Sequence, residues 1–379
     1  MTMSCDHPDL LPLDEALRRL WEALPAPSLS EVRAKRDDPA TDRASMDGVA
    51  LRASEGRTPR RILGTLFAGE DPTGFTVVPG TAVRIMTGAA MPPEADAVVP
   101  VEQLLTSGIT TSPLVDPSTG DHVSVRGCLA RAGDLLLAEG TPINAARVAL
   151  LAQEGHAIQT CPRIRVGVAS TGDELVQNPL PHQLRDSNGP MLFALARTLG
   201  AEAELRAPLP DDPIALATAL RAPGDIRILL TSGGVSMGDH DHLPAVLKEL
   251  GATILFHRIR LKPGKPMLAA LLGELLVLGL PGNPVSAYLN ALLFLSQALA
   301  RIEGRTAPDP WCKGRLTAAV KYKGDRPLLH PCRLVGGRLE PLPGKGSADL
   351  VTLAKADAFA WIEPGGLEAG AKTRWLPVL

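Results

Sequence analysis

Residues 275–300 read LLVLGLPGNPVSAYLNALLFLSQALA, and they contain a complete strand, turn and helix signal. Leu275 to Leu280 is a short, continuous apolar run, which is typical of a strand covered on both faces. Val285 to Ala300 stays apolar over a length that fits a buried helix. A strand that passes through a short Gly/Pro turn into a helix predicts one unit of an α/β domain.

The same alternation of strand and helix extends upstream to Arg163. Further strands are predicted at 164–169, 226–230 and 253–261, and further helices at 190–199 and 243–250. Alternation of this kind predicts a doubly wound α/β domain, with a largely parallel sheet and helices on both faces.

The sequence pattern differs on both sides of this α/β segment. Leu13 to Leu24 is an amphipathic helix, and Thr141 to Glu154 is helical again. From Glu31 to about Val125, short β-branched runs are broken by Gly and Pro. After Pro308 the chain returns to short strands and turns. We therefore expect a β-rich module before the α/β domain and a small β domain after it.

The composition of the 379 residues argues against several classes of protein. With 39 basic and 41 acidic side chains the formal net charge is −2, so no overall field attracts nucleic acid or an anionic membrane. Aromatic residues make up 3%, too few for a base-stacking platform, and the five cysteines form no CxxC pair. The apolar stretch Ala287 to Ala300 is short and interrupted by polar residues, and the N-terminus has no signal-peptide pattern. We expect a cytoplasmic protein without nucleic-acid or membrane partners.

Three predicted strands end in loops of small and polar residues. These loops are STGDEL at 170–175, TSGGVSMGDHD at 231–241 and PGNP at 281–284. In open α/β sheets, ligands bind where loops leave the carboxyl ends of the strands, so the three loops are expected to form one pocket. Glycines let backbone N–H groups approach a phosphate. Asn283 can cap the next helix with Pro284 at its first position, which presents a helix N-terminus to an anion.

The same loops also carry acids, namely Glu174 and Asp241, with Asp173 and Asp186 nearby. Carboxylates repel a bare phosphate, and a hard cation such as Mg²⁺ between them resolves the conflict. The alternative is that each glycine-rich turn only connects two strands, and for a single loop that interpretation is preferred. Three such loops in one domain favour a site. His240 alternates with acidic residues, but alternate residues of an extended segment point in opposite directions, which argues against a transition-metal cluster.

A basic stretch, FHRIRLKPGK, follows at residues 256–265. If it is a strand, Arg258, Arg260 and Lys262 share one face, and Lys265 follows in a glycine turn. Such a stripe suits an oxyanion or a phosphate. It is equally compatible with a solvated edge strand, because Lys and Arg commonly protect sheet edges.

Seven segments, in one order along the chain, resemble the molybdopterin molybdenumtransferase family, which includes the gephyrin E domain. The segments are SMDG at 45–48, RIMTGAAMPPEADAVVPVE at 84–102, STGDEL at 170–175, DSN at 186–188, TSGGVSMGDHD at 231–241, KPGKP at 262–266 and GLPGNPVSAYL at 279–289. A single hexamer can match by accident, whereas the ordered set is highly specific. The matches run from about residue 9 almost to the C-terminus.

The resemblance implies a homodimer of four parts in each protomer. These are a linker region (1–35 and 126–162), a β-rich domain (36–125), a molybdopterin-binding α/β domain (163–305) and a C-terminal β domain (306–379). It also implies a reaction in which adenylylated molybdopterin is hydrolysed with release of AMP and molybdate is inserted, with Mg²⁺ as the cofactor. A molybdenum enzyme or an adenylyltransferase is the implied protein partner.

Carried over by position, the resemblance assigns catalytic roles to Asp47, Glu174 and Asp241, the last two as Mg²⁺ ligands. The residues implied to bind substrate are Thr87, Gly88, Thr171, Gly172, Asp186, Ser187, Asn188, Ser232, Gly233, Gly234, Arg258, Lys262, Lys265, Pro281, Gly282, Asn283, Pro284 and Ser347. A molybdopterin adenylyltransferase explains the loops less well, because that activity leaves SMDG and MTGA without a role.

Two segments depart from the family pattern. Residues 125–131 read VRGCLAR, without the Glu-Asp pair that family members carry there. In the stretch 326–331, RPLLHP, proline stands where the family has a second arginine. These departures leave open an alternative function, a divergent and catalytically altered paralogue that binds molybdopterin or a partner enzyme as a scaffold or carrier.

Overall fold

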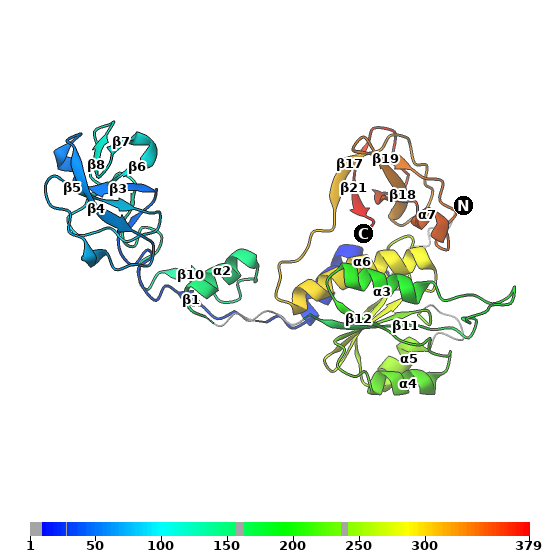
Figure 1. Ribbon diagram of the computed structural model, residues 1–379. Helices are drawn as coiled ribbons and strands as arrows, with labels where there is room; N and C mark the ends of the chain where they lie inside the picture. Colours follow the sequence, from blue (N-terminus) through cyan, green and yellow to red (C-terminus); the bar gives the residue numbers. More distant parts are fainter. Residues whose placement is uncertain (1–9, 28, 157–162, 236–241) are drawn as a thin grey trace. The chain divides into compact units, whose positions relative to one another are not determined.

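A computed structural model describes residues 10–27, 29–156, 163–235 and 242–379, which divide into two compact units (Figure 1). The larger unit spans Met1–Pro27 and Gln159–Leu379, and the smaller unit spans Ser28–Ile158. Each unit is described separately below. The boundaries predicted for the four parts stay a prediction.

The larger unit contains a six-stranded sheet with the order β12-β11-β13-β16-β15-β14. The four strands β12, β11, β13 and β16 are parallel, whereas β15 and β14 run antiparallel to their neighbours. The prediction of a largely parallel sheet is confirmed. The strand bounds are β11 Arg165–Ser170, β12 Glu202–Leu205, β13 Ile228–Ser232, β14 Thr253–His257, β15 Leu268–Leu272 and β16 Leu275–Leu280.

Helices cover both faces of this sheet, as predicted. On one face lie α3 (Asn188–Thr198) and α6 (Pro284–Ile302), and on the other lie α4 (Pro213–Arg221) and α5 (Leu243–Glu249) (Figure 1). The N-terminal helix α1 (Leu13–Ala23) packs into the same apolar core as α3 and α6. A separate core lies under α4 and α5. Helix α6 is long and apolar enough to cross a membrane. However, 83% of its most apolar 18-residue stretch is buried inside the protein, as expected of a core helix.

The prediction that a strand continues through residue 261 is wrong. Strand β14 ends at His257, and Arg258 has a φ of 73°, which no strand residue adopts. Beyond it, Arg260 N donates to Leu11 O and Lys262 N donates to Pro327 O. Backbone bonds to two separate segments, at Leu11 and at Pro327, therefore replace a ladder, and the predicted single basic face does not form.

The C-terminal part of the larger unit is a five-stranded antiparallel sheet with the order β17-β21-β20-β18-β19. Its core contains Leu316, Cys332 and Ile362. Leu329 and Phe359 instead belong to the core around α6, which joins this sheet to the α/β part. The bounds are β17 Cys312–Arg315, β18 Leu328–Val335, β19 Arg338–Pro341, α7 Leu350–Leu353, β20 Ala358–Ile362 and β21 Lys372–Pro377.

The smaller unit is β-rich, as predicted, and its main sheet has the order β6-β3-β5-β4-β8-β7. Two short strand pairs, β1–β10 and β2–β9, and the helix α2 (Ala145–Gln153) complete it. The strand bounds are β1 Val32–Arg33, β2 Arg43–Ala44, β3 Gly48–Leu51, β4 Arg60–Leu66, β5 Thr81–Ile85, β6 Ala97–Pro100, β7 Leu104–Ser107, β8 Thr110–Pro113, β9 Val123–Ser124 and β10 Leu135–Leu137.

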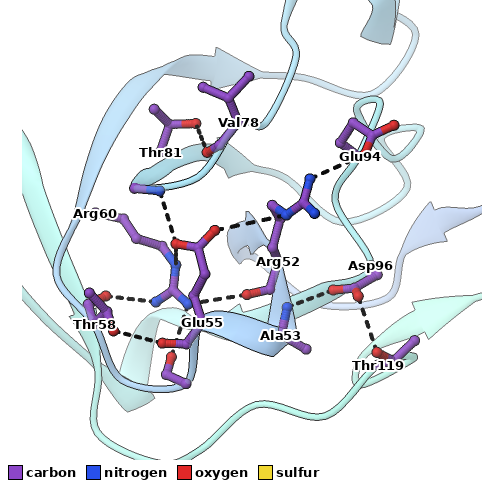
Figure 2. Close-up of polar contacts among 12 residues, drawn as sticks. Arg52, Ala53, Glu55, Thr58, Arg60, Val78, Thr81, Glu94, Asp96 and Thr119 are labelled. Carbon is purple, nitrogen blue, oxygen red and sulfur yellow. Dashed lines mark hydrogen bonds and ion pairs between the residues drawn. The ribbon is translucent and has the colours of Figure 1, made fainter.

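A buried arginine fixes the turn between β3 and β4 (Figure 2). The side chain of Arg60 is fully buried and donates to the carbonyl oxygens of Arg52, Gly56 and Thr58. The carboxylate of Glu55 lies 3.6 Å from Arg60 Nε and also accepts from Gly80 N. Burial lowers the pKa of Arg60, but guanidinium stays charged in proteins, so these acceptors are required. The cluster holds the chain that leaves β3.

Candidate functional site

The loops after β11, β13 and β16 meet at the carboxyl edge of the sheet. Thr171 N donates to Ser232 O over 2.8 Å, and Gly233 N donates to Leu280 O over 3.0 Å. Because β11, β13 and β16 are neighbouring parallel strands, their ends reach the same edge. The structure thus brings together the described residues of these loops and the segment 186–188 at the start of α3.

Asn188 links two of these loops. Its Nδ2 donates to Ser232 Oγ and to Gly282 O, both over 2.7 Å. The residue is 8% exposed, and its Oδ1 is buried without a hydrogen-bond partner among the described residues. A buried amide oxygen without a partner costs free energy unless a ligand or water donates to it. Asn188 therefore holds the loops and leaves one acceptor for a ligand.

Asp186 accepts hydrogen bonds from a backbone N–H group and from a hydroxyl. Its Oδ1 accepts from Ser170 Oγ over 2.8 Å and from Gly189 N over 2.9 Å. The second bond caps the first turn of α3, at which Ser187 occupies the preceding position without a side-chain cap of its own. These bonds give Asp186 a positioning role at the start of α3.

Gly233 is required where two loops approach each other. Its φ is +103°, and a Cβ there would lie 2.5 Å from Thr171 Oγ1 and 2.8 Å from Thr171 O. Gly172 and Gly234 also have positive φ values, of 141° and 67°. Only glycine combines this backbone conformation with such close contact. The glycines predicted to approach a phosphate therefore also allow the loops to pack together.

The predicted acids have different surroundings. Glu174 folds back over its own loop, so that a Cβ on Gly172 would lie 2.4 Å from Glu174 Oε2. Asp173 Oδ1 accepts from Asp211 N over 3.2 Å. Asp241 lies outside the described residues. Among the residues that the structure describes, no three His, Cys, Asp or Glu side chains gather around one point that could hold a metal ion.

A cavity of about 560 Å³ lies beside this edge, between the α/β part and the C-terminal sheet. Two predicted cations, Lys262 and Lys265, line it, together with the PGNP residues Pro281 and Asn283. Ser347, predicted from the resemblance, also lines it. Arg258, the third predicted cation, is not one of the described residues that line this cavity.

The segment that carries the two lysines is held from several directions. Lys262 O accepts from Leu329 N over 2.7 Å. Gly264 O accepts from Asn290 Nδ2 over 3.0 Å, and a Cβ on Gly264 would lie 2.6 Å from Asn290 Oδ1. The Lys262 ammonium lies 5.2 Å from the ring centroid of Tyr322, within cation–π range. Lys262 is therefore held both by its backbone and by its charged group.

The N-terminus of α6 adds to the positive potential of the cavity. Pro284 is the first residue of the 19-residue helix, and Asn283 occupies the cap position, but its side chain makes no capping bond. The predicted side-chain cap by Asn283 is therefore wrong, although the predicted helix start is confirmed. Val285 N donates to Ser347 O over 3.0 Å, which places Ser347 at this helix end. Helix N-termini carry partial positive charge.

Several residues of the C-terminal sheet line the cavity without having been predicted. Tyr322 is buried and His330 is half-buried, and burial raises the pKa of Tyr322 and lowers that of His330. Arg326 also lines it and donates to Leu261 O over 2.9 Å. Pro331 stands at the position where the family has an arginine, and it lines the same cavity. Arg326 keeps a guanidinium in this wall.

In the smaller unit, the two predicted site residues are bonded to each other. Asp47 Oδ1 accepts from Thr87 N over 2.7 Å and from Thr87 Oγ1 over 2.6 Å. These bonds lower the pKa of Asp47, so its carboxylate is charged at neutral pH. Gly48 packs against β6, where a Cβ would lie 2.1 Å from Val99 O, and Gly88 has a φ of 82°. The turn therefore presents a fixed, exposed carboxylate.

Three family models match the chain in succession. The MoeA N-terminal region (domain I and II) matches residues 11–155, the probable molybdopterin binding domain matches 167–301, and the MoeA C-terminal region (domain IV) matches 313–378. Together the three matches cover most of the chain.

Relatives and solved structures resemble the chain over nearly its whole length. The molybdopterin molybdenumtransferase of Nostoc sp. is 35% identical over 93% of this chain and 86% of its own, and that of Bacillus subtilis is 34% identical over 97% and 94%. The molybdopterin biosynthesis moeA protein from Pyrococcus horikoshii OT3 superimposes with a TM-score of 0.74 at 24% identity, covering 98% of this chain and 100% of that one. The molybdopterin biosynthesis moea protein from Pyrococcus horikosii gives a TM-score of 0.71 at 26% identity, covering 97% of this chain and 99% of that one.

Proposed function

The chain belongs to the molybdopterin molybdenumtransferase family, and we propose that it inserts molybdate into adenylylated molybdopterin with release of AMP. Its function lies in molybdenum-cofactor biosynthesis, and its curated relatives are named as transferases. Those names favour the enzyme over the alternative of a scaffold or carrier.

The observation that carries this proposal is the cavity of about 560 Å³. Lys262, Lys265 and Arg326 line it, and the N-terminus of α6 and Ser347 adjoin it. Molybdate is a tetrahedral dianion, and charge-assisted hydrogen bonds from ammonium and guanidinium groups are about twice as strong as neutral ones. The cavity therefore suits molybdate, the substrate that supplies the metal.

We assign the pterin phosphate to the adjoining carboxyl edge of the sheet. Gly233 and Gly234 bring backbone close to that edge, where a phosphate can approach. Asn188 Oδ1 is an unpaired acceptor there, among the residues that the structure describes, and it suits an N–H group of the pterin rather than the phosphate. The PGNP turn contributes to both places, because Gly282 accepts from Asn188 while Pro281 and Asn283 line the cavity. The two substrates would then meet at the PGNP turn.

Glu174 and Asp241 are our candidates to hold Mg²⁺. Mg²⁺ needs only one or two protein carboxylates, because waters and substrate phosphates complete its shell. Glu174 is a hard oxygen donor on the loop after β11, which fits that requirement. When bound, the ion would offset the phosphate charge at this edge. In this proposal, the side chains of the cavity and of the sheet edge bind and orient the two substrates.

We further propose that the protein is a cytoplasmic homodimer in which Asp47 and Thr87 act at the site of the neighbouring protomer. Asp47 is fixed by two bonds from Thr87, which suits a group that orients an attacking water or a metal-bound phosphate. The protein partner would be the adenylyltransferase that supplies the nucleotide, or the molybdenum enzyme that receives the product.

Two measurements test the function. Purified protein given adenylylated molybdopterin, Mg²⁺ and molybdate is expected to release AMP, and omission of molybdate is expected to stop the release. Protein that binds the pterin but never releases AMP would rule out the enzyme. Mixing Asp47→Asn and Glu174→Gln protomers tests the shared site, because only a site built from two protomers regains activity in the heterodimer. Two inactive variants that stay inactive when mixed would contradict it.

A further inference from the structure

Four cations share one face of the C-terminal sheet. Strands β17 and β21 pair so that Lys313 lies directly opposite Arg374 and Arg315 lies directly opposite Lys372. Side chains two residues apart on a strand point to the same face, so all four lie together. Like charges directly opposite each other destabilise a sheet. The fold therefore keeps two repelling pairs side by side (Figure 1 labels both strands).

These cations line an open groove of about 880 Å³, which also contains Arg338. Glu363 is the one carboxylate among the described residues that line it. Glu363 Oε1 accepts from Trp361 Nε1 over 2.7 Å, and its single negative charge can offset only one of the five cations that line the groove. Asp14 also approaches the groove cations, and its Oδ1 lies 4.0 Å from Arg374 NH1. The positive charge of this basic groove is therefore largely uncompensated by the described residues.

Protection of a sheet edge does not explain the arrangement. Lys313 and Arg315 lie on β17, which ends the strand order, and charges on such a strand discourage pairing with another chain. Lys372 lies on β21, which has partners on both sides. Edge protection needs no cations on that inner strand. The cations on β21, opposite those on β17, concentrate positive charge on one face of the sheet.

We propose that the basic groove binds an acidic segment of a partner protein. A segment with spaced carboxylates complements the four cations, and it would convert both repelling pairs into ion pairs. Nucleic acid fits less well, because Arg374 lies 4.3 Å from the Trp311 ring and 4.0 Å from the Trp361 ring and covers one face of each. Those faces cannot stack on bases. A single phosphate is small for a groove of about 880 Å³.

The test is a binding titration with the full chain and a fluorescein-labelled peptide in which glutamate alternates with glycine. At low salt we expect binding that weakens as salt rises, because exposed ion pairs are screened. The double variant Lys313→Gln/Lys372→Gln removes one cation from each opposed pair and is expected to weaken binding about tenfold, as for two exposed ion pairs. The matched control, Lys248→Gln/Lys355→Gln, removes the same charge from α5 and from the turn after α7 and is expected to bind normally.

A second measurement separates a binding surface from a structural one. Without peptide, the groove double variant is expected to melt at a higher temperature than the wild type at low salt, because two repulsions are removed. Its AMP release is expected to be unchanged. A lower melting temperature, an equal loss in the control variant or no peptide binding by the wild type would overturn the proposal. Stronger binding of a single-stranded oligonucleotide of equal charge would also overturn it, in favour of nucleic acid.

Discussion

The cavity beside the PGNP turn and the basic groove both concentrate lysine and arginine, yet they do so in different ways. In the cavity, Lys262 is fixed by backbone bonds to the C-terminal sheet and by the Tyr322 ring. In the groove, Lys313 and Lys372 are exposed and each faces another cation. A pinned cation loses little freedom when a small oxyanion binds, whereas free cations suit a longer, flexible partner. We therefore propose that the same residue types serve two kinds of anion.

The largest effect is expected from a substitution in the rigid loops beside the cavity. In Gly233→Ala, a Cβ would lie 2.5 Å from Thr171 Oγ1 at a φ of +103°. We expect a loss of about 2 kcal/mol of stability and at least about a hundredfold less AMP release, since backbone strain and a displaced loop combine. Thermal unfolding and the AMP assay measure the two.

Gly251→Ala is the control for that variant. Gly251 has a φ of +78°, but no atom of the described residues lies within 4 Å of the point that its Cβ would occupy, so the variant isolates the backbone effect. We expect it to cost about 1 kcal/mol and to leave AMP release unchanged. Equal activity losses in both variants would show that the contact between the loops is unimportant.

A smaller effect is expected from loosening Lys262. Tyr322→Leu removes the ring under the ammonium, and we expect the molybdate concentration for half-maximal AMP release to rise about fivefold, in line with a cation–π contact of about 1 kcal/mol. Tyr322→Phe keeps the ring and is expected to behave like the wild type. If both variants lose affinity equally, the hydroxyl rather than the ring face is what matters.

The smallest effect concerns acid pH at the wall of the cavity. Asp349 accepts bonds from Thr352 and from Lys345 N, which lowers its pKa from 3.8 to about 2. Because the pKa of Asp349 is lower in the folded state than in the unfolded chain, its carboxylate stabilises the fold at pH values above the unfolded-state pKa. That contribution is lost as the pH falls toward 2. Between pH 4 and 2, the melting temperature of Asp349→Asn should fall less steeply with decreasing pH than that of the wild type. Identical slopes would contradict this account.

Much of the α/β part could be predicted because its signals are local. The apolar run Leu275 to Leu280, the PGNP turn and the following helix are each specified by their own residues, and β11 and β13 follow the same logic. Helix α4 is not among the helices predicted above, although Asp212 and Pro213 mark its start, with Asp212 Oδ2 accepting from Ala215 N. That signal was present in the sequence.

The composition of the cavity wall could not be predicted from local signals. Whether Tyr322 and His330 meet Lys262 depends on how the C-terminal sheet packs against α6, and no periodicity records that contact. The turn at Arg258 is a similar case. Its positive φ is stabilised by distant backbone partners, among them Met267 O, rather than by a glycine. The resemblance to a family identified Ser347, which residue chemistry alone would not have singled out.

The most direct test of the central claim is a calorimetric titration of molybdate into three proteins. The wild type is expected to bind molybdate, Lys265→Gln to bind it at least about tenfold more weakly, and Lys372→Gln to bind it like the wild type. The loss of one charge-assisted hydrogen bond accounts for that factor in the cavity variant. Unchanged affinity in Lys265→Gln, or an equal loss in Lys372→Gln, would contradict the assignment of the cavity as the oxyanion site.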